Sequence, residues 1–175
     1  MDTATSNPIE NVTYRGLTER LVIDQLVTPA GASEIAEVAR SQSKTLIQEL
    51  LDGNHIDSAA LAAIVSEEYG VPLFNLTPMV HEHLPLDLVP QSLIRKHKAL
   101  PLYRRGNRLF IAIADPTNTS ALAEFKFATG IATDSVVVEQ KQLLETISEV
   151  IAKQDEVFDG DIADFASAED YIPDL

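Results

Sequence analysis

Residues 17–27 read LTERLVIDQLV, and residues 46–56 read LIQELLDGNHI, which repeats the same apolar spacing 29 positions later. In both runs the apolar residues recur at the spacing of one side of an α-helix. Residues 61–65 likewise match residues 35–39 at an offset of 26. Two helix-turn-helix units related by an internal repeat are therefore predicted, because each unit alone cannot bury its apolar stripe and the stacked pair can.

Local signals give the expected ends of these helices. Pro29 is expected to interrupt the chain after the first helix, and Ser33 to cap a second helix that ends near Gln42. Asp57 is expected to cap the fourth helix, and Gly70 is suited to end it in the left-handed conformation. Four helices are thus predicted before residue 71.

The pattern changes from helical to mixed after Pro72. Residues 99–104 and 108–114 are typical of strands, and the Gly106-Asn107 pair between them is a hairpin turn signal. This half is expected to be a short sheet with helices on one face. The remaining expected elements are a short helix from Pro90 to about His97, helices over 120–128 and 141–153, and a strand over 133–139.

We therefore predict an α+β fold with a helical amino-terminal half and a small α/β half that contains a β-hairpin. The expected divisions are a disordered segment over 1–13, a helical repeat subdomain over 14–76, a small α+β subdomain over 77–153 and a disordered acidic linker over 154–175. The linker is indicated by eight acids and no base after Lys153, mixed with scattered apolar residues. A docking peptide is the alternative interpretation of that stretch.

The composition excludes several classes of function. The chain has 13 basic and 27 acidic residues and a formal charge of -14, so nucleic-acid phosphates repel it. It has no cysteine, which rules out disulfides and thiolate metal sites. No apolar run approaches the ~18 residues of a membrane span, and the first residues do not form a signal peptide. We expect a cytoplasmic protein without membrane insertion or nucleic-acid partners.

Residues 93–118 read LIRKHKALPLYRRGNRLFIAIADPTN, with YGVPLFNL at 69–76 and FATG at 127–130. Together these motifs resemble the amino-terminal domain of type IV pilus-extension ATPases and of type II secretion ATPases, over about residues 16–150. That resemblance implies a hexameric cytoplasmic motor with a P-loop ATPase domain after this region. The P-loop string Gly-x4-Gly-Lys-Ser/Thr does not occur here. The chain is therefore expected to be non-catalytic and cofactor-free, with ATP and Mg²⁺ bound only in the ATPase domain that follows the linker.

The first helix carries the candidate partner site, because it is apolar on two sides. Ile23 and Leu26 fall on the side opposite Leu17 and Leu21. Such a helix is either fully buried or has one face reserved for a partner, and both interpretations stay open. The resemblance implies a PilZ-type adaptor as that partner, beside the ATPase domain and the hexamer neighbours. The predicted partner-binding residues are Tyr14, Leu17, Thr18, Leu21, Val22 and Gln25.

Direct binding of cyclic di-GMP is the alternative function. In some relatives each helical repeat begins with Arg-Leu-Gly, whose arginine and glycine serve that ligand. The matching positions here read Gly16-Leu17-Thr18 and Thr45-Leu46-Ile47, so both arginines and both glycines are missing.

Other polar clusters are better explained without a specific site. His81-Glu82-His83 lacks a further ligand nearby, so a solvated loop is favoured over a metal site. No spacing indicates catalytic residues. The basic residues between 95 and 108 are interpreted as a solvated face, or alternatively as a contact with the acidic tail, the ATPase domain or another subunit.

Overall fold

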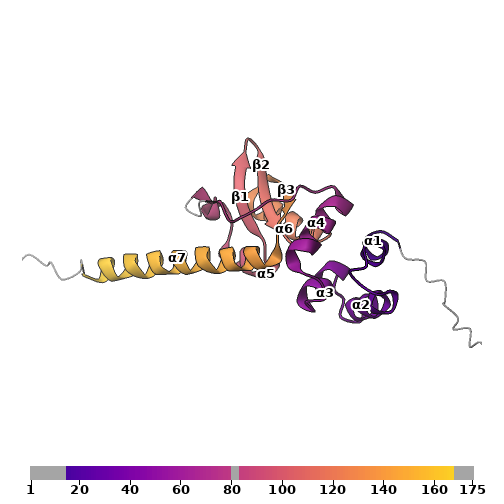
Figure 1. Cartoon of the computed structure of the whole chain (residues 1–175). Helices are drawn as coiled ribbons and strands as arrows, with labels where there is room; N and C mark the ends of the chain where they lie inside the picture. Colours follow the sequence, from indigo (N-terminus) through magenta and orange to yellow (C-terminus); the bar gives the residue numbers. More distant parts are fainter. Residues whose placement is uncertain (1–14, 80–82, 168–175) are drawn as a thin grey trace, which may run out of the picture.

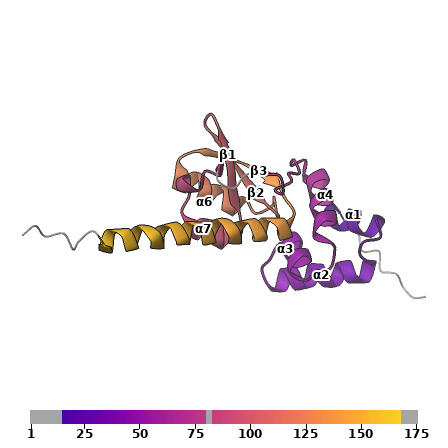
Figure 2. The same ribbon diagram turned by 60° about the vertical axis from the view of Figure 1, so that its left-hand side comes forward.

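The computed structural model describes residues 15–79 and 83–167, with side chains as far as Asp155. The helical part lies beside a three-stranded sheet, and the last helix runs along the sheet unit and then beyond it (Figures 1 and 2). This confirms the predicted α+β class. The elements are α1 Leu17–Ile23, α2 Pro29–Ser41, α3 Leu46–Asp52, α4 Ser58–Tyr69, the 3₁₀ helix η2 Leu86–Leu88, α5 Gln91–His97, β1 Leu100–Arg105, β2 Arg108–Ile113, α6 Thr119–Thr129, β3 Ala132–Val137 and α7 Gln140–Ser167.

The start of α2 differs from the prediction. Thr28 is the N-cap, and its hydroxyl accepts a hydrogen bond from the backbone N of Gly31 at 3.1 Å. Pro29 is the first helical residue, so the prediction that it interrupts the chain and that Ser33 caps the helix is wrong. Proline is favourable here because the N–H groups of the first turn have no partner within the helix.

Both ends of α4 have the caps that the sequence predicted, and α3 has a cap that was not predicted. Asp57 accepts a hydrogen bond from the backbone N of Ala60 at 3.1 Å, which confirms it as the N-cap of α4. Gly70 ends α4 with a φ of 63°, in the left-handed region. Thr45 and Gln48 form a reciprocal capping box at the start of α3.

The sheet has the order β1-β2-β3. β1 and β2 form the predicted antiparallel hairpin around Gly106-Asn107, whereas β2 and β3 are parallel and α6 connects them. Leu73 extends the sheet by a parallel bridge to Val137. Residues 72–76, assigned from the sequence to the helical subdomain, are therefore anchored on the sheet.

Two apolar cores meet at β3. The larger lies between the sheet, α5, α6 and α7, with Phe125 and Leu143 fully buried at its centre. The smaller joins α1 to α4 around Leu21, Leu50 and Val65 and includes Val137 of β3. The helical repeats thus pack against the sheet as well as against each other.

Helix α7 is longer than predicted. The predicted helix ends at Lys153, whereas α7 continues to Ser167 (Figure 1). Apolar residues recur at helical spacing through the acidic stretch, as Ile151, Phe158, Ile162 and Phe165, which explains the continuation. Residues 154–167 of the predicted linker are helical, whereas 168–175 and 1–13 lie outside the described residues. Of the helices described, none combines the length and apolarity needed to cross a membrane.

Candidate functional site

The structure divides the predicted partner-binding residues of α1 into two groups. Leu17 and Leu21 are 4% and 2% exposed and belong to the helical core. Thr18 and Val22 are half-buried, and Gln25 is exposed just after the helix. Tyr14 lies outside the described residues. The buried interpretation, left open from the sequence, therefore holds for the two leucines.

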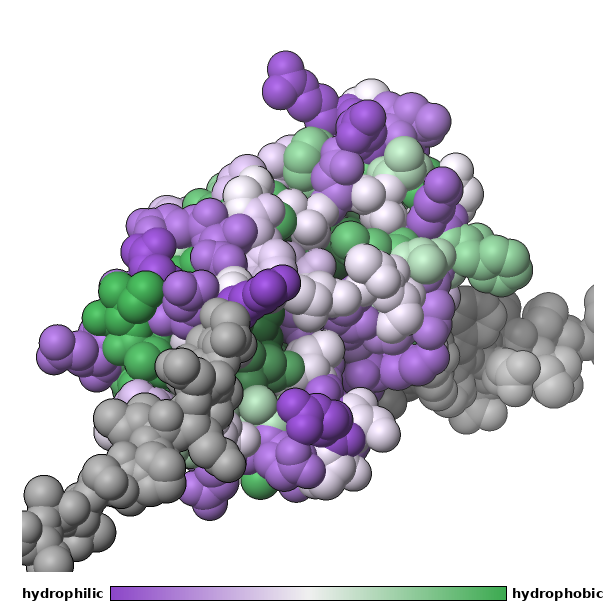
Figure 3. All heavy atoms as spheres, turned by 90° about the vertical axis from the view of Figure 1, so that its right-hand side faces the viewer, coloured by the Kyte–Doolittle hydropathy of each residue, from purple (hydrophilic) through white to green (hydrophobic). Residues whose placement is uncertain are grey.

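The exposed apolar side chains lie on the opposite side of α1. Ile23 is 66% exposed and Leu26 is 39% exposed. Sequence reasoning placed both residues on this side but left them out of the partner set, although the two-sided pattern was the signal. Figure 3 shows the face on the α1 and α2 side, where apolar patches interrupt a mostly hydrophilic surface.

A hollow of about 340 Å³ lies beside these exposed side chains, and Leu26 is one of its lining residues. It is bounded by the α1–α2 loop, α2 and α3, and Leu26, Val27 and Ile35 give it apolar walls. Glu49 also lines it and is 8% exposed, with Lys44 at 3.7 Å from its carboxylate. We define Ile23, Leu26 and this hollow as the α1 patch. It is concave, and its lining combines apolar side chains with the polar or charged Thr28, Glu34, Glu49 and His55.

Ion pairs hold α1 in place beside the patch. The Arg20 guanidinium donates to Asp24 at 2.6 Å and to Glu67 of α4 at 3.0 Å. These hydrogen bonds, first to Asp24 and then to Glu67, raise the pKa of Arg20. The Arg20 charge is thus engaged within the fold.

A hydrogen bond joins the start of α3, the first helix of the second repeat, to the loop that follows β2. Asp115 follows β2, is 6% exposed, and accepts hydrogen bonds from the hydroxyls of Thr45 and Thr117 and from the backbone N of Thr117. A second contact of this kind joins Ser58 of α4 to Glu139 at 2.6 Å. Neither link was predicted from the sequence, because 70 and 81 residues separate the partners. They fix the helical repeats on the carboxyl end of the sheet.

The pKa of Tyr69 is expected to be sensitive to the contact between the helical repeats and the sheet, because Asp115 lies near its phenol group. Burial raises the pKa of Tyr69 above its usual value of 10.0, and the negative charges of Asp115 and Glu68 raise it further. Because the folded pKa is the higher one, this contribution to stability is complete below pH 10.0 and is lost as the pH rises through the folded pKa. Phenolate absorbance of the chain, compared with Tyr69→Phe, should show one tyrosine that ionises late. Its ionisation at the usual pH would contradict the prediction.

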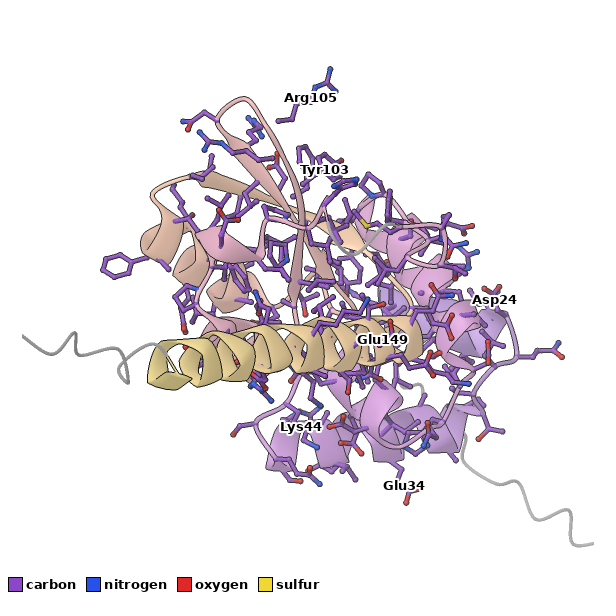
Figure 4. The ribbon with its side chains drawn as sticks, turned by 90° about the vertical axis from the view of Figure 1, so that its left-hand side faces the viewer. Asp24, Glu34, Lys44, Tyr103, Arg105 and Glu149 are labelled. Carbon is purple, nitrogen blue, oxygen red and sulfur yellow. The ribbon has the colours of Figure 1, made fainter. Side chains whose placement is uncertain are left out.

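Half of the six basic residues between 95 and 108 make ion pairs within the described fold. Lys96 contacts Glu124 at 2.7 Å, and Arg108 contacts Asp134 at 2.6 Å. Arg95 contacts Asp155, the first acid after Lys153, at 3.4 Å. Arg105 makes no ion pair among the described residues, and Figure 4 shows it at the hairpin tip. The expected solvated face is present, together with one contact to the acidic stretch.

The possible metal cluster falls mostly outside the structure. His81 and Glu82 lie outside the described residues, and His83 is exposed. Among the residues that the structure describes, no group of three or more His, Cys, Asp or Glu side chains gathers as a metal site requires.

Comparison with known proteins points to one family. The model of the MshEN domain matches residues 69–157, just over half of the chain. The type IV pilus assembly ATPase PilB of Pseudomonas aeruginosa is 31% identical over 134 residues, which are 77% of this chain and 24% of the relative. PilB of Myxococcus xanthus is 29% identical over 138 residues, 79% of this chain and 24% of the relative. The chain thus spans about a quarter of the length of these relatives.

Two solved structures share the fold. The structure of MshE with cdg has a TM-score of 0.60 and 20% identity, and it covers 78% of this chain and 99% of that one. The amino-terminal domain of XpsE has a TM-score of 0.62 and 17% identity, covering 78% and 96%. The family match begins at Tyr69, so it covers the sheet unit and does not reach α1.

Proposed function

Because the chain belongs to the MshEN family of domains, we propose that it is a non-catalytic regulatory domain of a cytoplasmic ATPase that extends type IV pili. In this proposal a PilZ-type adaptor docks on the α1 patch. The observation that carries it is the exposure of Ile23 and Leu26 at the end of the first helix, beside a hollow with both apolar and polar lining residues. Of the other residues predicted to bind a partner, Thr18 and Val22 are half-buried and Gln25 is exposed, whereas Leu17 and Leu21 belong to the core.

The expected strength of docking follows from burial. Fully burying an apolar side chain of this size contributes about 1.5–3 kcal/mol before the costs of association. Ile23 and Leu26 are only partly exposed in the free chain, so together they supply a few kcal/mol at most. Binding in the micromolar range is expected, and a large share of it should depend on these two side chains.

The double substitution Ile23→Glu, Leu26→Glu is expected to weaken adaptor binding at least about tenfold, because two charges would enter an apolar contact. Stability should change by no more than about 1–2 kcal/mol, since Ile23 is 66% exposed and Leu26 is 39% exposed. Calorimetry with a purified PilZ-type adaptor and circular dichroism measure the two effects.

Phe127→Glu is the matched control. Phe127 is 93% exposed on α6, in the sheet unit, so its replacement makes a similar chemical change away from the patch. It should leave adaptor binding unchanged. Full affinity in the double variant, or no binding by the parent chain, would exclude the α1 patch as the docking site.

Direct binding of cyclic di-GMP is the second candidate, supported by the shared fold with the structure of MshE with cdg. Its requirements are less well met. The two repeat heads offer Gly16 and Thr45 where an arginine is expected, Thr45 is occupied by its capping box, and Arg20 is held by two carboxylates. Titration with cyclic di-GMP is expected to give no heat, and micromolar binding would favour this function over adaptor docking.

A further inference from the structure

Lysine 98 occupies a backbone conformation that normally favours glycine. Three helices, α4, α5 and α6, end on a residue in the left-handed region: Gly70 with φ 63°, Lys98 with φ 48° and Gly130 with φ 67°. Glycine adopts this conformation without strain, whereas a residue with a Cβ does so at a cost. Gln25, Ser43 and Asn54, which follow α1, α2 and α3, also have positive φ, so the surroundings of Lys98 rather than its backbone conformation decide whether its side chain has a role.

The Lys98 side chain lies in a long groove along α7. Two adjoining cavities of about 610 and 510 Å³ share Lys98 and Leu144 as lining residues. On α7 the lining continues through Ile147, Ile151 and Asp155, at the spacing of a single helix face. We call these two cavities together the α7 groove. Its floor along α7 is aliphatic, whereas its part beside the α3–α4 loop is lined mainly by polar residues, and Leu144 is 39% exposed within it.

The unpaired charge in the α7 groove is positive. Lys98 and Lys141 both line it, both are exposed, and within the described residues neither makes an ion pair. The three carboxylates that line the groove are all engaged. They are Asp52 with Lys44 at 2.9 Å, Asp57 with the backbone N of Ala60 at 3.1 Å, and Asp155 with Arg95 at 3.4 Å. In a chain of charge -14, this groove offers two lysines to an anionic partner.

The lining of the groove favours a peptide over a nucleotide. Among the described residues, no Phe, Tyr or Trp lines either cavity, and the His55 imidazole is the one ring on which a base could stack. Aliphatic residues flanked by cations instead suit a segment in which carboxylates alternate with apolar side chains. Such a segment follows α7 in this chain: residues 168–175 read AEDYIPDL, with three carboxylates and no base.

A chain's own segment cannot fill its own groove while α7 is intact. Ser167 lies 20 residues beyond Ile147, an axial distance of about 30 Å at the rise of an α-helix. Eight extended residues span at most about 26–29 Å, so they do not reach back to Lys98. Figure 1 shows α7 leading away from the rest of the molecule. A second copy has no such restriction.

We propose that the α7 groove of one copy binds residues 168–175 of a second copy, through Lys98 and Lys141 and the aliphatic floor around Leu144. The contact is head-to-tail, since one copy supplies the groove and the other the acidic segment. Such contacts generate rings where the rotation closes and open chains where it does not. This interaction is separate from adaptor docking, because the α1 patch contributes no residue to it.

Two complementary variants test the proposal. The first, Lys98→Glu with Lys141→Glu, reverses the charge of the groove. The second, Glu169→Gln with Asp170→Asn and Asp174→Asn, removes the negative side-chain charges of residues 168–175. Sedimentation velocity from about 10 µM to about 1 mM should show reversible, salt-sensitive association of the parent chain. Each variant alone should associate at least about tenfold more weakly. A mixture of the two should regain association, because the segment of the first variant still fits the groove of the second.

Controls separate this contact from general charge effects and from misfolding. Arg105→Glu with Lys126→Glu makes the same change in net charge at exposed sites away from α7, and should leave association unchanged (Figure 4 shows Arg105). Lys98→Gly should weaken association yet raise the melting temperature, since glycine relieves the left-handed strain. A parent chain that stays monomeric at 1 mM, or a groove-reversed variant that associates like the parent, would overturn the proposal.

Discussion

Replacing Leu21 by glutamate is expected to unfold the helical part of the chain, at a cost of about 4 kcal/mol or more. Leu21 is 2% exposed and packs in the core that α1, α2, α3 and α4 share with Val137. The substitution removes an apolar side chain from a packed site and places a charge there without a partner. Chemical denaturation followed by circular dichroism measures the loss.

Ile23→Glu gives the comparison from the same helix. Ile23 lies two residues after Leu21 and is 66% exposed, so its replacement should change stability by about 0.5 kcal/mol or less. The two variants thus separate a core position from a surface position within seven residues. If Leu21→Glu stays folded and loses only adaptor binding, Leu21 belongs to the docking surface and the burial described above does not hold in solution.

The two sides of α1 show where sequence reasoning stops. Periodicity correctly indicated an apolar face on each side of the helix, but periodicity is a property of one helix alone. Which face is buried depends on α2 and α4, whose positions are set by contacts far along the chain. The internal repeat offered the better signal, because Leu17 and Leu21 match Leu46 and Leu50, and Leu50 is 1% exposed.

Elements with strong local chemistry were predictable. Asp57, Gly70 and the Gly106-Asn107 turn all act as their residue types predict, because capping and turn conformations involve only near neighbours in sequence. Pro29 was misjudged because proline both breaks helices and begins them. The choice between these roles depended on Thr28, whose hydroxyl caps the first turn.

The junction between the helical repeats and the sheet was beyond local reasoning. Asp115 stands in an Asp-Pro-Thr turn after a strand, which predicts only the end of that strand. Its partner Thr45 is 70 residues away and is itself an N-cap, a sufficient local explanation for a threonine. Because the local sequence already accounts for both residues, it gives no sign of the hydrogen bond between Thr45 and Asp115.

Asp115→Ala is expected to destabilise the chain by about 2–4 kcal/mol and to loosen the helical repeats from the sheet. The substitution leaves the Thr45 hydroxyl and two donors of Thr117 without an acceptor, and each buried donor left unpaired costs about 1–3 kcal/mol. Hydrogen exchange should rise first at the start of α3, where Thr45 caps the helix. Ser58→Ala removes only the second link, to Glu139, and should cost about 1 kcal/mol.

A double-mutant cycle isolates the contact that joins the two parts. Thr45→Ala alone loses both the α3 cap and the hydrogen bond to Asp115, so its cost mixes a local effect with a long-range one. Combining it with Asp115→Ala should give less destabilisation than the sum of the single variants, with a coupling of about 0.5–3 kcal/mol. Strict additivity would mean that Thr45 serves only its own helix. In that case Val137, which packs in the helical core from β3, would be the main connection between repeats and sheet.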